Sequence, residues 1–231
     1  MEEITSTING IKTKFICEKC KHEQNANIFP YINFNQNPEY YALVKDSSIF
    51  QVTCEKCKHV TFIKYDALYL NEEQKYFIYL LTDKTLVQKF RHQIRYFLET
   101  MLNKDDKYNF DEFKTRLVFD VNTLIEKLAI FELGLNDVVI EIIKYGFYEN
   151  DMIDENLYDI VLFDGIKETN LEFVLLNSKN SKLIDKIFIG IDYYNKFVDK
   201  LSVMKNDDEI FSIIDYEWVN SKISNINKKV D

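Results

Sequence analysis

The sequence predicts an α+β protein with a β-rich N-terminal region, a helical segment and a mixed α/β C-terminal part. Three observations predict this class. Two Cys-x-x-Cys motifs have strand-like runs on both sides, apolar residues recur at helical spacing between residues 85 and 149, and alternating apolar patterns return from residue 157. Because strands and helices come in successive blocks, we do not expect a doubly wound sheet. We expect two domains, residues 1–82 and 83–231.

The N-terminal region is predicted to consist mainly of short strands after a lead-in at residues 1–10. Runs of β-branched and aromatic residues place these strands at residues 12–16, 23–34, 49–53, 60–65 and 75–81. Pro30 marks an edge or a bulge within the second strand. Asn37-Pro38-Glu39 predicts the start of a helix that runs to about residue 45, with Asn37 as its cap.

Three helices are predicted between residues 85 and 149. The clearest, at residues 85–102, has an apolar stripe of Leu86, Phe90, Ile94, Phe97, Leu98 and Met101. Its polar side carries Lys89, Arg91, His92 and Arg95. A short strand at residues 116–119 precedes helices at 121–133 and 137–149. Gly134 suits the C-cap of the first of these helices, and Asn136 or Asp137 suits the N-cap of the second.

The C-terminal part is predicted to begin with strands at residues 158–163, 171–176 and 183–189. Asp192 is expected to cap a helix that runs to residue 201. Residues 209–223 predict a strand followed by a short helix around Trp218, which we expect to be a packing anchor.

One hexapeptide, Cys-Glu-Lys-Cys-Lys-His, occurs twice, at residues 17–22 and 54–59. It contains all four cysteines of the chain, with the spacing C-x2-C-x33-C-x2-C. Four thiolates fill a tetrahedral structural zinc site and leave no open position, and strands around two such tight turns are typical of a zinc ribbon. We therefore predict one structural Zn²⁺ bound by Cys17, Cys20, Cys54 and Cys57. A redox-active pair of dithiols is the alternative.

The other residues of the hexapeptide admit several functions. Zinc with four thiolates carries a charge of −2, which the adjacent Lys19, Lys21, Lys56 and Lys58 would offset. The same lysines, together with Lys89, Arg91 and Arg95, could instead bind nucleic acid. His22 and His59 are not expected to bind the zinc, because four sulfur ligands already complete its coordination. In an enzyme, one of these histidines could act beside a zinc that has lost a thiolate.

Composition favours a soluble protein of the cytoplasm. The net charge is −9, which argues against non-specific nucleic-acid binding as the main activity. No apolar run reaches the ~20 residues that a membrane helix needs, and the N-terminus lacks the pattern of a signal peptide. Paired cysteines that stay reduced also fit the cytoplasm. The many Asn, Ile, Lys, Phe and Tyr residues, which have AT-rich codons, suggest a bacterial or phage genome.

Familiar catalytic motifs are absent from the sequence. Its five glycines are scattered and form no phosphate-binding loop, and neither HExxH nor GxSxG occurs. We therefore expect a non-catalytic module that mediates protein interaction or regulation, with a protein as its partner. Nucleic-acid binding is the first alternative, and an enzyme of unknown reaction is the second.

The chain resembles the CpXC proteins, a prokaryotic family named for two Cys-Pro-x-Cys motifs. Besides the two cysteine pairs, the resemblance rests on Ile32-Asn33, Pro38-Glu39, Leu68-Tyr69, Phe77-Ile78-Tyr79, residues 122–127 and residues 134–137. It implies a zinc-ribbon-like domain and no particular activity. Glu18 and Glu55 replace the prolines of the family name, and Lys21 and Lys58 stand where such turns often have glycine. If that position requires a positive φ, each lysine costs on the order of 1 kcal/mol.

Overall fold

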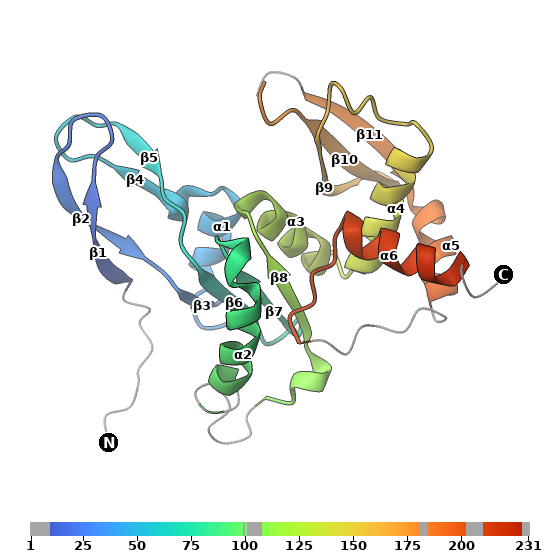
Figure 1. Ribbon diagram of the computed structural model, residues 1–231, viewed down its shortest axis with the longest axis horizontal. Helices are drawn as coiled ribbons and strands as arrows, with labels where there is room; N and C mark the ends of the chain where they lie inside the picture. Colours follow the sequence, from blue (N-terminus) through green and yellow to red (C-terminus); the bar gives the residue numbers. More distant parts are fainter. Residues whose placement is uncertain (1–9, 99, 101–107, 181–183, 202–209, 228–231) are drawn as a thin grey trace. The chain divides into compact units, whose positions relative to one another are not determined.

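The computed structural model describes residues 10–98, 100, 108–180, 184–201 and 210–227 and has the α+β class that the sequence predicts (Figure 1). The chain forms two compact units, Met1–Leu124 (unit 1) and Ile125–Asp231 (unit 2). This division falls later along the chain than the predicted boundary after residue 82. The reason is that strand β8 (Lys114–Val118) joins the sheet of unit 1 through its parallel neighbour β7 (Tyr76–Leu80).

Two antiparallel hairpins hold the repeated hexapeptides at their turns. The first pairs β1 (Ile11–Ile16) with β2 (Glu23–Ile28), and the second pairs β4 (Gln51–Thr53) with β5 (Val60–Phe62). The predicted strands around both motifs are therefore confirmed, with two differences. The run predicted at residues 23–34 is divided at Pro30 into β2 and β3 (Tyr31–Asn33), and residues 48–50 form a 3-10 turn, η1 (Ser48–Phe50), instead of strand.

The larger sheet of unit 1 has the strand order β3-β6-β7-β8. β3 is parallel to β6 (Ala67–Asn71), β6 is antiparallel to β7, and β7 is parallel to β8. The sequence pattern did not predict β6, in which four of the five residues are buried. Its apolar run lacks the alternation that marks a half-exposed strand, because it lies in the interior of the sheet.

The helices of unit 1 lie where the sequence predicts them, with differences at their ends. α1 (Glu39–Lys45) is where it was predicted, but its N-cap is Pro38 and no side chain caps it. The buried Asn37 side chain instead donates to the Asn33 carbonyl oxygen at 3.5 Å, so the prediction of an Asn37 cap is wrong. The helix predicted at 85–102 comprises η2 (Lys84–Leu86) and α2 (Val87–Phe97), and Met101 and Leu102 lie outside the described residues.

Helices α3 (Val121–Glu132) and α4 (Asp137–Glu149) form a hairpin whose turn agrees with the sequence. Gly134 has a φ of 67°, the left-handed conformation that ends many helices. The Asn136 side chain accepts a hydrogen bond from the Val138 backbone N–H at 2.9 Å, which confirms it as the cap of α4. This turn is determined locally, so sequence alone could locate it.

The rest of unit 2 is an antiparallel sheet followed by two helices. The sheet has the order β11-β10-β9, from β9 (Ile160–Lys167), β10 (Asn170–Leu176) and β11 (Ile184–Gly190). Alternate residues of β10 are buried. Phe173 of β10 packs edge-on against Phe147 of α4, with the two ring centroids 5.0 Å apart. This ring contact joins the sheet to the helical hairpin.

Two C-terminal predictions need correction. α5 (Ile191–Leu201) starts directly after β11, so Asp192 lies in its first turn and is not the cap. In the described part of the strand predicted from residue 209, which begins at residue 210, one bridging residue occurs, Ser212. α6 (Tyr216–Asn227) contains Trp218 as predicted. Among the described residues, no helix is long and apolar enough to cross a membrane.

Candidate metal centre

Each hexapeptide folds into the same turn. In the first copy, the Cys17 N–H donates to the His22 carbonyl at 2.9 Å and the Lys21 N–H donates to the Cys17 carbonyl at 2.9 Å. The corresponding bonds of the second copy, Cys54 to His59 and Lys58 to Cys54, measure 2.8 and 2.9 Å. Identical sequence therefore gives an identical knuckle at the end of each hairpin.

The last lysine of each knuckle has a left-handed backbone. φ is 58° at Lys21 and 59° at Lys58, the region that favours glycine. The positive φ that the sequence analysis considered for these positions is therefore present, and its cost is on the order of 1 kcal/mol per lysine. We infer that the hydrogen bonds of the knuckle impose this geometry, together with any metal ion that the cysteines bind.

A small apolar core packs the two hairpins against each other. It contains Phe15, Ala26 and Val52 beside the buried cysteines Cys17 and Cys54. With so few apolar side chains, the hairpins bury little surface by themselves. The core aligns the two knuckles, and a metal ion bound between them would add to their stability.

The four sulfur atoms converge. Cys17 Sγ lies 3.6 Å from Cys57 Sγ, and Cys20 Sγ lies 3.6 Å from Cys54 Sγ. All four sulfurs are within 4.8 Å of one another. A tetrahedral ion with metal–sulfur bonds of about 2.3 Å needs sulfurs roughly 3.8 Å apart. The cluster can therefore hold one metal ion, with Cys17 and Cys54 fully buried and Cys20 and Cys57 half-buried.

The thiols strongly affect one another's protonation. The backbone N–H groups of Cys57 and Lys56 lower the pKa of the Cys54 thiol to about 6. The His22 backbone N–H acts in the same direction on Cys20, but burial and the other three thiols raise the pKa of Cys20 to about 12. Four crowded thiols therefore cannot all ionise by themselves at neutral pH. A bound cation would supply the charge that stabilises four thiolates together.

The family model described as CpXC protein matches residues 15–144, more than half of the chain. The chain belongs to the CpXC family. No curated protein and no solved structure matches it. The matched segment contains both knuckles and ends inside α4, so the CpXC region covers nearly all of unit 1 and the start of unit 2.

The charged residues of the CpXC knuckles are exposed to solvent, and the two histidines are half-buried. Lys19, Lys21, Lys56 and Lys58 are exposed, and so are Glu18 and Glu55 at the positions of the family's prolines. His22 and His59 are half-buried, and neither belongs to the group of converging ligand atoms. Both histidines contribute backbone carbonyls to the knuckle, a role that any residue could take.

Gln24 is a residue of the site that the sequence analysis missed. Its side-chain nitrogen donates to the Thr53 carbonyl at 3.1 Å, and its side-chain oxygen accepts from the Glu55 N–H at 2.8 Å. A single amide thus joins β2 to the entrance of the second knuckle. Nothing in the local pattern distinguishes Gln24 from the other polar residues of its strand, because both of its partners are about thirty residues away along the chain.

Proposed function

We propose that the protein binds one structural zinc ion through Cys17, Cys20, Cys54 and Cys57 and that it serves as a non-catalytic interaction module. The observation that carries the proposal is the convergence of four sulfurs from two matching knuckles. Four thiolates occupy every position of a tetrahedral ion, so no position stays open for water or substrate. Such a closed site stabilises the fold and does not activate a ligand.

Zinc is the metal that best suits this ligand set. Thiolates are soft ligands, and a tetrahedral arrangement of four sulfurs selects zinc or iron–sulfur centres over magnesium, calcium or manganese. Zinc imposes no geometry of its own beyond the preference for four ligands, and it is not redox-active. A site built from two hairpin turns, with a small apolar core beneath it, matches the structural use of zinc.

Charge at the knuckles favours a protein partner over nucleic acid. Four lysines and two glutamates surround the cluster, and all six are exposed. Their net charge of about +2 offsets the −2 of zinc with four thiolates, so no strongly positive surface results. The hairpins also expose apolar side chains, with Ile16 at 52%, Val60 at 50% and Phe62 at 44%. Exposed apolar side chains beside a neutral site are suited to contact with another protein.

Metal analysis tests the zinc site. We expect one zinc ion per chain in the purified protein, and a cobalt-substituted form whose absorption is that of tetrahedral thiolate ligation. Cys17→Ser and Cys54→Ser should each reduce the metal content and lower the melting temperature of the hairpins, since metal binding is coupled to folding. Ser224→Ala, at an exposed position of α6, is the control. Unchanged melting with full metal content in both cysteine variants would contradict the proposal.

Affinity purification tests the interaction function. We expect a protein partner that is retained by the wild type and lost with Val60→Lys, because the new charge would have to be buried in the contact. Gln74→Lys adds the same charge at an exposed site between β6 and β7 and should retain the partner. RNA or DNA that co-purifies in place of a protein, with binding that weakens steeply in salt, would remove this part of the proposal.

A further inference from the structure

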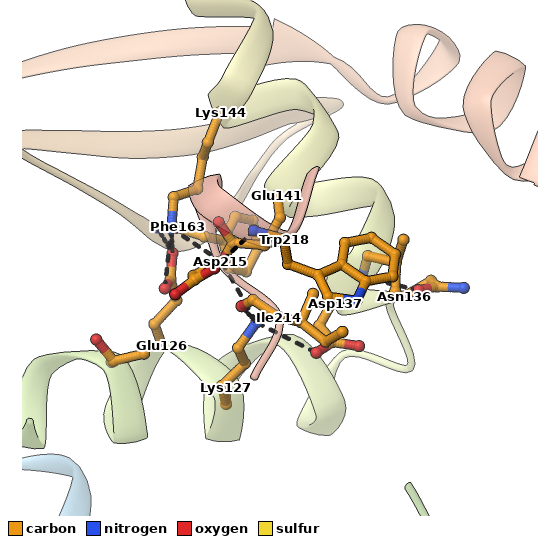
Figure 2. A network of polar contacts seen from close by, with 12 residues as sticks. Glu126, Lys127, Asn136, Asp137, Glu141, Lys144, Phe163, Ile214, Asp215 and Trp218 are labelled. Atoms are coloured by element: carbon orange, nitrogen blue, oxygen red, sulfur yellow. Dashed lines mark hydrogen bonds and ion pairs between the residues drawn. The ribbon is translucent and has the colours of Figure 1, made fainter. Parts of the chain in front are cut away.

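Unit 2 contains a cluster of five charged side chains in its interior, at the interface of α3 and α4 (Figure 2). The members are Glu126, Lys127, Asp137, Glu141 and Lys144. The first four are 1–3% exposed, and the side chain of Lys144 is 12% exposed. Charged groups are rarely buried so completely unless they are paired, because they lose their hydration.

Lys144 connects two of the carboxylates. Its Nζ lies 2.9 and 3.1 Å from the two side-chain oxygens of Glu126, and 3.1 Å from Oε1 of Glu141. Oε1 of Glu126 also accepts the Phe163 backbone N–H of β9 at 2.7 Å. Glu126 therefore joins the helical hairpin to the sheet.

Lys127 occupies the other half of the cluster. Its Nζ lies 3.2 Å from Asp137 Oδ2 and 3.3 Å from Glu141 Oε1, and it donates to the Ile214 carbonyl at 3.0 Å. Ile214 precedes α6, so Lys127 attaches the C-terminal segment to α3 and α4 (Figure 2). All five charged residues lie within the CpXC match, whereas Phe163 and Ile214 lie beyond it.

The cluster has one acidic group too many. Three carboxyl groups face two ammonium groups, so the fully ionised cluster would carry −1 in a site with almost no water. We propose that the cluster binds one proton, that Glu126 holds it, and that this proton makes the stability of unit 2 depend on pH. With Glu126 neutral, two carboxylates balance two ammonium groups.

The surroundings identify Glu126 as the proton carrier. Burial raises the pKa of Glu126, and the nearby charges of Lys144 and Lys127 and the Phe163 N–H only partly oppose this, while Glu141 adds to it. Burial lowers the pKa of Lys144, and the Glu126 and Glu141 carboxylates raise it. With Glu126 protonated, the contact of Lys144 with Glu141 at 3.1 Å remains. Oε1 of Glu126 accepts both Lys144 and the Phe163 N–H, whereas Oε2 accepts Lys144 alone, so we place the proton on Oε2.

Other titratable side chains also lie near the cluster. Tyr148 on α4 and Tyr194 on α5 have their pKa values raised by burial, so both stay neutral from pH 5 to 8. Tyr194 accepts the Asn136 N–H through its hydroxyl. Asp215, ahead of α6, accepts the Trp218 N–H and is not fully buried.

The sign of the effect follows from linkage. The pKa of Glu126 is higher in the folded protein than its ordinary value of 4.5, so folding favours the protonated form. Its contribution is complete below that value and is lost as the pH rises through the folded pKa. Between pH 4.5 and the folded pKa, the unfolding equilibrium constant of unit 2 should rise by up to about tenfold per pH unit from this group alone, and above the folded pKa this dependence should level off.

The fluorescence of Trp218 reports the unfolding of unit 2, because Trp218 is the single tryptophan of the chain and lies in unit 2 near the cluster. We would follow denaturant unfolding by its fluorescence from pH 5 to 8 in the full-length, metal-loaded protein. In the wild type, the unfolding midpoint should fall with rising pH as one proton is lost. Glu126→Gln should lack this fall, so its midpoint at pH 8 should be as high as its midpoint at pH 5. Glu141→Gln, which weakens contacts with both lysines, should lower the midpoint throughout the range.

A spectroscopic measurement keeps the inference testable if Glu126→Gln fails to fold. The side-chain carboxyl ¹³C resonance of Glu126 in the folded wild type should lie at the protonated position at pH 5. A resonance at the ionised position across pH 5 to 8 would overturn the inference. So would a Glu126→Gln variant that is destabilised at pH 8 as strongly as Glu141→Gln.

Discussion

At the scale of single residues, the site combines identical local sequence with unequal surroundings. Within each pair the first cysteine, Cys17 or Cys54, is buried under the apolar core, and the second, Cys20 or Cys57, reaches the surface. The lysine that follows each pair accepts a left-handed backbone. The knuckles therefore keep a conformation that is locally unfavourable for lysine, and the free energy of metal binding can offset that cost.

Glycine at position 21 tests this strain. Lys21→Gly removes a side chain where φ is 58°, whereas Lys19→Gly removes the same charge in the same turn at a residue without positive φ. We expect Lys21→Gly to be the more stable of the two variants by about 1 kcal/mol. Both substitutions raise the backbone entropy of the unfolded chain, but only Lys21→Gly also relieves the strain of a left-handed backbone. Denaturant unfolding followed by the cobalt–thiolate absorption of the metal-substituted protein measures the difference. Equal stabilities would show that the knuckle is unstrained.

At the scale of elements, both candidate features arise from pairs of hairpins or helices. Two β-hairpins bring four sulfurs together, and Gln24 joins them through two backbone groups. A helical hairpin brings three carboxyl and two ammonium groups together, and Lys127 attaches the segment before α6. Each hairpin or helix alone supplies only part of the sulfur cluster or of the charged cluster. The Glu126→Gln test belongs to this scale, since the proton would act on the packing of α3 and α4 against β9.

At the scale of the whole molecule, the chain has two units with different sources of stability. The hairpins of unit 1 have a small apolar core around the cysteines, whereas unit 2 has a sheet with a buried face and a helical hairpin that contacts it. A core this small would gain much of its stability from the proposed metal ion. Metal removal should therefore affect the two units unequally.

Chelation tests that expectation. Treatment of the loaded protein with a strong chelator at neutral pH should reduce the far-ultraviolet circular dichroism of the hairpins and leave Trp218 fluorescence unchanged. Re-addition of zinc should restore the circular dichroism, which controls for irreversible damage. A red shift of Trp218 fluorescence that accompanies metal loss would contradict independent stabilities of the two units.

Local patterns were sufficient for much of the fold and for the metal cluster. The knuckle, the Gly134 turn and the Asn136 cap depend on residues close together in the chain, and each was predicted at the right place. β6 and the Asn37 cap were not predicted correctly. β6 is recognisable only from its neighbours β3 and β7, and Asn37 turns its side chain toward Asn33 because the fold buries it.

The sequence by itself determined which four atoms can bind a metal, because a repeated hexapeptide with two cysteines specifies its own turn. Only the tertiary structure decided that those turns face each other, that Gln24 joins them, and that Glu126, Lys127 and their partners are buried instead of solvated. The physical reason is the range of the interactions. Turn geometry is set by a few adjacent residues, whereas burial and charge pairing depend on segments that meet only when the chain has folded.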